Sequence, residues 1–358
     1  MKRSFRLLSL LLAVLMLLSL LSACQNDEPV ATTEGGSSSL PYGSIHTAAQ
    51  AAYLAGDYKQ FSAYANGKKE LSRPEGIAVT WTEQGKAPYR VEIGEAGADN
   101  ALTFDASSSP FVFYNAKVGC TYRYTVTDAD GNLVTEGSFD TPAQAPRNLR
   151  IDGVTNARDL GGWMTSDGPV RQGLLYRTAK YNADESTEAV VTAEGIRTAL
   201  TQLGIRTELD LRTTNDNENG GITQSPLGDS VRYISFPMQS GGNILSLNRA
   251  LLPELFAILG DENNYPLVFH CSIGTDRTGM VAFLIGALLG VAEEDLYRDY
   301  LFSNFGEIGG MRTPSAVNNY LTALRACEGD TLSQKAYRYL VDAGVSAADL
   351  DAFIAIMK

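Results

Sequence analysis

Short apolar segments with the character of strands alternate with helix-like segments throughout the second half of the chain. The alternation follows a Pro-containing stretch at 141–146 of the 358 residues. Strands are expected at 173–177, 205–211, 231–236 and 267–270, and helices at 187–203, 253–259 and 279–289. Such alternation is typical of an α/β fold, in which a parallel or mixed sheet carries helices on both faces. We therefore expect one α/β domain over 147–358, with its site at the carboxyl ends of the strands.

The first half of the chain has a different periodicity. Apolar and polar residues alternate there in six short segments separated by turn residues. These expected strands lie at 77–82, 89–93, 101–104, 111–114, 121–126 and 133–139. We expect a small all-β sandwich over 74–142, and Trp81 with Tyr122 and Tyr124 makes it resemble a fibronectin type III or immunoglobulin-like module. The sequence does not predict what it binds. Residues 45–73 are expected to form a short helical segment.

The N-terminal residues are expected to lie outside both domains. Three basic residues precede an apolar run at 7–21, which is the pattern of a signal peptide. The run ends in Leu-Ser-Ala before Cys24, and this sequence resembles the lipobox of bacterial lipoproteins, whose Cys is lipidated. We expect a lipoprotein signal peptide at 1–23 and a flexible tether at 24–44. The protein would then be exported and lipid-anchored at the cell membrane, facing outside the cytoplasm. An uncleaved membrane-spanning anchor formed by the same run is the alternative.

The composition narrows the function classes. The chain has 29 Lys and Arg against 41 Asp and Glu, a formal net charge of −12, which disfavours nucleic-acid binding. Its 2 His, His46 and His270, and its 4 Cys leave little room for a histidine-rich metal site or a disulfide scaffold. We expect no metal and no cofactor. His46 is expected at the surface, Cys120 as a buried inert thiol and Cys327 as an unpaired thiol.

One loop carries the candidate chemistry. A buried strand at 266–270 runs directly into Cys271, and an apolar helix follows Gly279. A tight loop that leads into a helix N-terminus gathers backbone N–H groups around one concavity, where the helix dipole favours an anion. The expected phosphate-binding donors are those of Ser272, Ile273, Gly274, Thr275, Asp276 and Arg277.

The side chains of the loop also favour the binding of a phosphoryl group. Arg277 offers a planar, permanently charged fork for two phosphoryl oxygens. The positive surroundings are expected to lower the pKa of Cys271 below about 8.5, which makes it a nucleophilic thiolate at neutral pH. Thr278 can donate a hydrogen bond to its sulfur, and His270 is expected to orient the loop through backbone hydrogen bonds.

The residues from His270 to Gly279, HCSIGTDRTG, resemble the phosphate loop of the cysteine-dependent protein tyrosine phosphatases. Four further segments resemble the bacterial members of that family, which include secreted and lipoprotein phosphatases active on phosphotyrosine and phosphoinositides. They lie at 156–162, 175–178, 209–213 and 299–304. The resemblance implies the cysteine-phosphatase fold. It also implies that Cys271 attacks phosphorus to form a thiophosphoryl enzyme, while Arg277 and the loop amides stabilise the transferring group.

This mechanism needs a general acid that protonates the leaving oxygen. Asp276 lies within the loop, as in family members whose acid precedes the Arg, and Asp216 lies in a loop that could close over the site. We favour Asp276. Arg158 and Asp159 either line the pocket or form a structural ion pair. Thr275 stands where close family members usually carry Lys, which favours a phosphomonoester such as phosphotyrosine over a polyphosphoinositide.

The leading hypothesis is a metal-independent phosphatase for phosphotyrosine-like monoesters, held at the membrane by an N-terminal lipid. The first alternative is a catalytically silent phosphate-recognition module, and the second is a phosphoinositide phosphatase. In a third hypothesis, the β-sandwich binds a surface and phosphatase activity is incidental. Arg177 and Arg212 are expected to be structural.

Overall fold

The computed structural model describes residues 44–183, 190–214 and 218–358. The predicted signal peptide, Cys24 and the predicted tether up to residue 43 lie outside the described residues, and so does Asp216. Within the described part of the chain, no helix is both long enough and apolar enough to cross a membrane.

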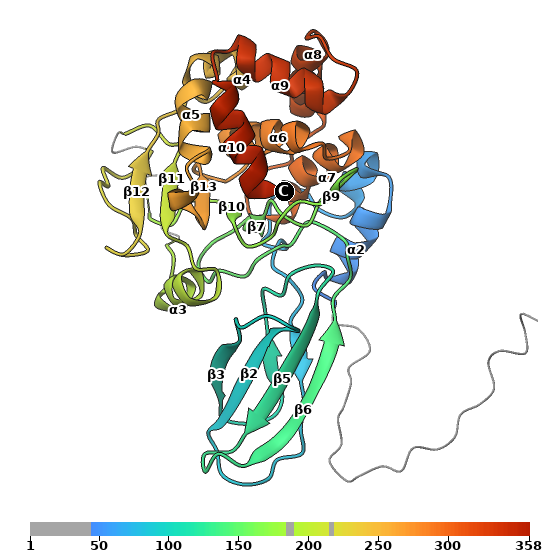
Figure 1. Cartoon of the computed structure of the whole chain (residues 1–358), viewed down its shortest axis with the longest axis vertical. Helices are drawn as coiled ribbons and strands as arrows, with labels where there is room; N and C mark the ends of the chain where they lie inside the picture. The colour runs from blue at the N-terminus through green and yellow to red at the C-terminus, as the bar shows by residue number, and fades with distance from the viewer. Residues whose placement is uncertain (1–43, 184–189, 215–217) are drawn as a thin grey trace, which may run out of the picture. The chain divides into compact units, whose positions relative to one another are not determined.

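A five-stranded sheet forms the centre of the second half of the chain (Figure 1). Its order is β12-β11-β13-β10-β7, with four parallel strands and β7 antiparallel at one edge. The strands are β7 Arg158–Asp159, β10 Leu175–Thr178, β11 Thr207–Asp210, β12 Arg232–Ser235 and β13 Leu267–His270. The register aligns Thr178, Asp210 and His270, the last residues of three parallel strands. Their carboxyl ends therefore meet at one edge of the sheet, where a site is expected.

Helices cover both faces of this sheet. Successive residues of a strand point to opposite faces. Accordingly, Leu267 and Phe269 belong to one hydrophobic core and Val268 to another. The helices of this half are α3 Ala193–Arg197, η2 Thr198–Gln202, α4 Ile244–Leu247, η3 Arg249–Leu251, α5 Leu252–Leu259, η4 Glu262–Asn264, α6 Asp276–Leu289, α7 Glu293–Phe302, η5 Ser303–Phe305, α8 Ser315–Arg325, α9 Leu332–Asp342 and α10 Ala347–Met357. A small hairpin pairs β8 Met164–Thr165 with β9 Gly168–Pro169. The prediction of a mixed sheet flanked by helices is confirmed.

Residues 77–140, which we call the β-module, form two antiparallel sheets. One pairs β1 with β4, and the other has the order β3-β2-β5-β6. The strands are β1 Ile77–Val79, β2 Tyr89–Glu95, β3 Leu102–Ala106, β4 Phe111–Phe113, β5 Thr121–Thr127 and β6 Leu133–Asp140. Residues of both sheets, such as Val79 and Val126, contribute to one core. All six predicted strands are present, while the likeness to a fibronectin type III module stays a prediction.

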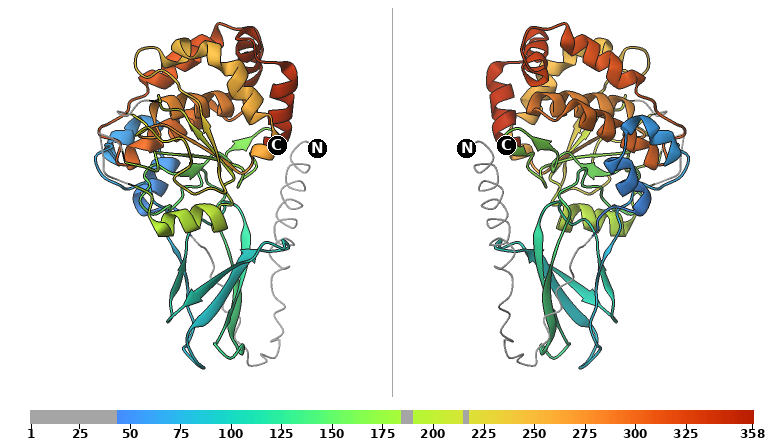
Figure 2. Two further views of the ribbon diagram at one scale, coloured as in Figure 1. Left: turned by 90° about the vertical axis from the view of Figure 1, so that its left-hand side faces the viewer. Right: turned by 90° about the vertical axis from the view of Figure 1, so that its right-hand side faces the viewer.

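Residues 44–76 precede the β-module, and we call them the arm. They contain α2 Ala48–Ala55 and the 3-10 helix η1 Tyr58–Ala63, so the predicted short helices are present. The arm packs on α7 and η5: the Tyr53 ring lies 5.5 Å from that of Phe305 in η5, and Tyr58 stacks on Tyr297 of α7 at 4.5 Å. Both views of Figure 2 show the blue helices of the arm beside orange helices of the C-terminal half. The β-module is thus inserted, along the chain, between two segments of one packed body.

The prediction of a surface position for His46 is wrong. His46 is only 4% exposed, and its Nε2 atom lies 2.8 Å from the carbonyl oxygen of Pro146. Burial lowers the pKa of His46 below its usual value, although the hydrogen bond to Pro146 opposes this. The two residues are 100 positions apart, so no local pattern could reveal that the start of the arm is covered.

We expect Tyr53→Ala to lower the free energy of unfolding by about 3–5 kcal/mol, because truncation of a fully buried aromatic side chain leaves a cavity. The matched control is Leu133→Ala in the β-module, where the side chain is largely exposed and the change should stay within about 0.5 kcal/mol. Urea unfolding followed by fluorescence measures both. If Tyr53→Ala were as stable as the wild type, the arm would not be part of this core.

Candidate active site

Strand β13 and helix α6 are joined by a loop of five residues, 271–275. Gly274 in this loop has φ of +68°, and a Cβ atom there would lie 2.4 Å from the carbonyl oxygen of Thr178. Only glycine meets both conditions, because other residues are strained at this φ and have no room for a side chain. The loop therefore curls closely against the end of β10 and leads into the N-terminus of α6, where the helix dipole favours an anion.

Cys271 is the first residue of the loop and is 2% exposed. Burial alone would raise the pKa of its thiol. The positive charge of Arg277 and the neighbouring Thr278 outweigh burial, and the charge of Asp276 opposes them. The net result is a pKa below the usual value of a thiol. A lowered pKa favours the thiolate, which is the form in which a cysteine is reactive.

Arg277 lies on the first turn of α6, with part of its guanidinium group already bound. Nη1 donates to the carbonyl oxygens of Leu211 at 3.2 Å and Met238 at 3.3 Å, and Nη2 pairs with Glu218. Nε is buried and has no hydrogen-bond partner among the described residues. A buried donor without a partner is costly, so Nε is the atom that an anion in the loop would satisfy.

Glu218 is a residue of this site that the sequence did not single out. One carboxylate oxygen, Oε1, pairs with Arg277 and lies 3.4 Å from the Ser272 hydroxyl, while Oε2 accepts the Thr213 amide at 2.9 Å and also its hydroxyl. Burial raises the pKa of Glu218, but the hydrogen bonds from Arg277 and Thr213 bring it below the usual value. Glu218 therefore holds Arg277 as a carboxylate. Its one sequence signal is its place two residues after Asp216.

Asn156 holds the loop from outside. Its Nδ2 group donates to the carbonyl oxygens of Ile273 and Gly274, both at 3.1 Å, and lies 3.3 Å from Thr275 Oγ1. Arg158 Nη1 donates to Asn156 Oδ1 at 2.6 Å, which fixes the orientation of the amide. Arg158 is completely buried, so it supports the loop from behind and does not line a pocket.

Asp299 joins Arg158 to a second buried arginine. Its Oδ1 atom lies 2.8 Å from Arg158 Nε, and its Oδ2 atom lies 2.5 Å from Arg177 Nη1. Arg177 Nη2 in turn donates to the carbonyl oxygen of Gly274 at 2.8 Å. Burial and the neighbouring Arg158 lower the pKa of Arg177 to about 10, although Asp299 counteracts them. Arg177 therefore supports the loop.

Asp159 is separate from this network. It is completely buried and pairs with Arg147 at 2.9 Å, and it also accepts the amides of Gly161 and Gly173. Arg158 and Asp159 do not pair with each other, since each has its own partner of opposite charge. Asp159 therefore ties together the chain around β7, away from the loop.

His270 is fully buried and faces two acidic residues of β11. Its Nε2 atom lies 2.8 Å from Glu208 Oε1, and its Nδ1 atom lies 3.8 Å from Asp210 Oδ1 and 3.3 Å from the carbonyl oxygen of Cys271. Burial lowers the pKa of His270, but Asp210 and Glu208 together raise it above the usual value. Of these three contacts, one is with the loop, at Cys271, and the other two are with β11. His270 is therefore held chiefly by the neighbouring strand.

The three side chains of Glu208, Asp210 and His270 are close enough together to hold a metal ion. Each carboxylate already has other partners, however. Glu208 accepts a hydrogen bond from Ser225 at 2.5 Å, and Asp210 pairs with Arg212 at 2.7 Å. A guanidinium group directly beside the cluster disfavours a cation there, so the residues fit a charged hydrogen-bond network better than a metal site.

Asp276, the first residue of α6, points toward a residue far along the chain. Arg312 binds both of its carboxylate oxygens, with Nε 3.0 Å from Oδ1 and Nη2 3.0 Å from Oδ2. Sequence reasoning did not identify Arg312, which lies 36 positions away in an irregular segment.

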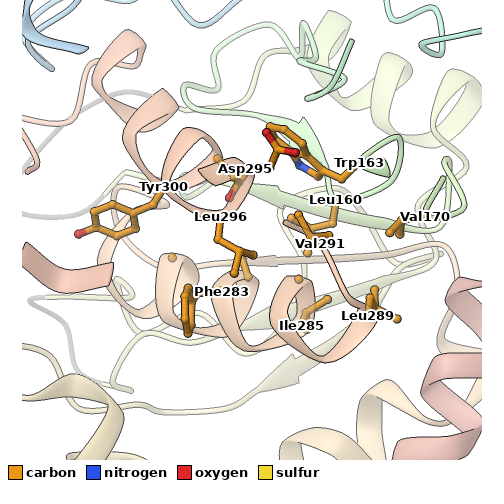
Figure 3. A pocket seen from close by; sticks show the side chains of 14 residues that line it. Leu160, Trp163, Val170, Phe283, Ile285, Leu289, Val291, Asp295, Leu296 and Tyr300 are labelled. Carbon is orange, nitrogen blue, oxygen red and sulfur yellow. The ribbon is translucent and has the colours of Figure 1, made fainter. Parts of the chain in front are cut away.

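A narrow apolar crevice runs along α6 behind the loop, and Figure 3 shows its lining side chains, including Trp163, Phe283 and Leu296. It has room for about 20 Å³, on the order of one water molecule, and neither Cys271 nor Arg277 lines it. The crevice is therefore a packing space behind the helix and is separate from the candidate site.

The lowered pKa of Cys271 predicts its reactivity. We expect iodoacetamide to alkylate Cys271 at pH values where an ordinary thiol, with a pKa of about 8.5, is still protonated. The thiolate persists as the pH falls below that value and is lost only below the lowered pKa. In Arg277→Met the midpoint of the rate against pH should move to higher pH, because burial raises the pKa of Cys271 and the charge of Arg277 no longer lowers it. Mass spectrometry of the Cys271 peptide follows the rate against pH, with Arg325→Met as the control. Equal midpoints in Arg277→Met and the wild type would contradict this account.

Known proteins resemble the chain over the segment that contains this site. Residues 149–340, just over half of the chain, match the family model described as the tyrosine phosphatase family. A protein of Cupriavidus necator named "Putative tyrosine-protein phosphatase" is 28% identical over 256 residues, which cover 61% of this chain and 87% of that protein. A "Tyrosine-protein phosphatase" of Nostoc commune is 27% identical over 131 residues, which cover 30% of this chain and 43% of that protein.

Proposed function

Since the chain belongs to the tyrosine phosphatase family, we propose that this phosphatase hydrolyses phosphomonoesters with Cys271 as its nucleophile. The observation that carries the proposal is the state of Arg277. Its charge lowers the pKa of the Cys271 thiol, and its buried Nε atom has no partner among the described residues. A phosphoryl oxygen bound at the loop would accept a hydrogen bond from Nε while its phosphorus faces the sulfur.

The reaction has two steps. In the first, the Cys271 sulfur forms a bond to phosphorus as the ester P–O bond breaks, which gives a thiophosphoryl enzyme. Arg277 and the backbone N–H groups from Ser272 to Arg277 stabilise the charge on the equatorial oxygens. In the second, water attacks phosphorus, the S–P bond breaks, and inorganic phosphate leaves with the thiolate restored.

The leaving oxygen needs a proton in the first step. We propose that Asp276 donates it, and that the resulting carboxylate removes a proton from water in the second step. Its place on the first turn of α6, next to Arg277, supports this assignment. Asp216 is the alternative acid and lies outside the described residues.

The substrate of a phosphatase is a phosphorylated molecule, and we propose a phosphotyrosine-like monoester. Two similar proteins carry names with tyrosine-protein phosphatase, which supports this class. Thr275 supports it too, because its side chain is buried and adds no second cation within the loop. A phosphoinositide is the alternative substrate. A silent phosphate-recognition module is the alternative from another class; the lowered pKa of Cys271 argues against it, because recognition alone needs no nucleophile.

We further propose that the phosphatase is exported and lipid-anchored, with a signal peptide at 1–23 and a tether at 24–44. The domain bounds proposed are 74–142 for a fibronectin III-like sandwich and 147–358 for the catalytic domain, with 45–73 as a short helical segment. Two antiparallel sheets with a shared core support the first of these.

We expect the purified protein to hydrolyse p-nitrophenyl phosphate with a chelator present, since the proposed groups are all side chains and amides of the chain. Cys271→Ser should lose at least about 10³-fold in kcat, because a serine hydroxyl at this site is not ionised at neutral pH. Its binding of vanadate, measured by calorimetry, shows whether the loop is still folded. A folded wild type that binds vanadate without turnover would favour the recognition module.

The proposed anchor predicts a lipid on Cys24. Expressed from its full sequence in a bacterial host, the wild type should sediment with membranes and incorporate labelled palmitate, while Cys24→Ser should do neither. Cys327→Ser is the control, since that half-buried thiol lies far along the chain from the leader. Palmitate labelling of Cys24→Ser equal to that of the wild type would exclude the anchor.

A further inference from the structure

A second cation lies beside the phosphate loop without belonging to it. The guanidinium group of Arg312 binds Asp276 through two N–H···O contacts of 3.0 Å each. The Arg312 side chain is 25% exposed and that of Asp276 is 37% exposed. Solvent therefore reaches both partners, and an anion that enters the site can compete with Asp276 for the guanidinium group.

The geometry conflicts with acid catalysis as long as this pair is closed. Both oxygens of Asp276 accept hydrogen bonds from Arg312, which is the binding mode of an ionised carboxylate. A protonated carboxyl group has no charge, and its O–H oxygen is a much weaker acceptor, so protonation and the two-contact pair with Arg312 oppose each other. The pair must therefore open before Asp276 can protonate the leaving oxygen.

The backbone of Arg312 is held by two hydrogen bonds, whereas its side chain has one strong partner among the described residues, Asp276. The Arg312 amide donates to Asn304 Oδ1 at 2.6 Å, and its carbonyl oxygen accepts from Asn304 Nδ2 at 3.0 Å. The side chain's remaining contact is with the carbonyl oxygen of Gly310 at 3.2 Å. Burial lowers the pKa of Arg312, but the pairing with Asp276 raises it above the usual value. The charge of Cys271 also contributes to the rise, so the guanidinium group lies within electrostatic reach of Cys271.

We propose that Arg312 is a specificity-determining residue of the phosphatase, which moves from Asp276 to a second phosphate group on the substrate and thereby frees Asp276 to act as the acid. The inference rests on the proposed nucleophile Cys271 and the proposed acid Asp276, and it replaces the single-phosphate substrate proposed above by a small ring that carries two neighbouring phosphates. A phosphate dianion on the substrate can displace Asp276 from Arg312 because it carries more charge than a carboxylate. A carboxylate on the substrate would gain nothing, because it has the same charge as the Asp276 side chain that it replaces. The freed Asp276 takes up a proton from solvent and passes it to the ester oxygen as the P–O bond breaks.

The test compares two matched substrates, phenyl phosphate and 1,2-benzenediol bisphosphate. For each, kcat and KM are measured with the wild type, Arg312→Gln and the control Arg325→Gln, which removes a similar two-contact pair with Glu293 at an exposed position. We expect the ratio of kcat/KM for the bisphosphate to that for phenyl phosphate to fall about tenfold in Arg312→Gln and to stay unchanged in Arg325→Gln. A loss of folded protein lowers both rates alike and leaves the ratio intact.

An equal ratio in Arg312→Gln and the wild type overturns the inference and leaves the proposed function standing. A wild type that hydrolyses neither substrate overturns both. The same comparison with mono- and bisphosphorylated headgroups on vesicles distinguishes a lipid substrate from a soluble one, and an Arg312-dependent ratio in either form supports the proposal.

A second measurement leaves Arg312 in place. In a Cys271→Ser background, Asp276→Asn removes the carboxylate that occupies the guanidinium group. Calorimetry should then show a gain in affinity for the bisphosphate that is several times the gain for phenyl phosphate. Equal gains for the two ligands would show that Asp276 acts only through its charge and that Arg312 does not take over the second phosphate, which also overturns the inference.

Discussion

Asp299 on α7 pairs with two completely buried guanidinium groups, those of Arg158 and Arg177. Two such cations repel each other and have lost their hydration, and removal of the anion from a buried ion pair typically costs about 3–5 kcal/mol. Through Asn156 and directly through Arg177, these cations hold carbonyl oxygens of the loop on its outer side. Because C=O and N–H of a trans peptide point in opposite directions, the N–H groups are left for the concavity. The anion site thus depends on a carboxylate that never contacts the anion.

Each cation around the site already has an anionic partner among the described residues. Arg277 pairs with Glu218 and Arg312 with Asp276. An arriving phosphate group therefore meets cations whose charge is already balanced by a carboxylate, which makes ground-state binding less favourable than binding to unpaired cations. Catalysis gains from such an arrangement, because only interactions that strengthen in the transition state accelerate the reaction.

The sequence predicted best what depends on neighbouring residues. The run from His270 to Gly279 places strand, loop and helix within ten residues, and β13 ends and α6 follows as that run predicts. The arrangement of α/β elements followed from periodicity in the same way. Glu218, Arg312 and the burial of His46 were missed, because each depends on a partner 36 to 100 residues away that no local pattern announces. Asn156 was noticed only as part of a motif, since its contact with Ile273 spans 117 positions.

The contacts of the arm affect the order in which the parts of the chain can fold. Tyr53 of the arm contacts Arg298, 245 residues later, whereas every strand of the β-module pairs within 77–140. At about 5–20 residues per second, a ribosome needs roughly 10–50 s to make the surface on which the arm packs. The β-module can pair its strands during that interval. The apolar side chains of Tyr53 and Phe61 stay exposed until the residues that cover them are synthesised. The docking of the arm is therefore a late event in folding, after the strands of the β-module can already have paired.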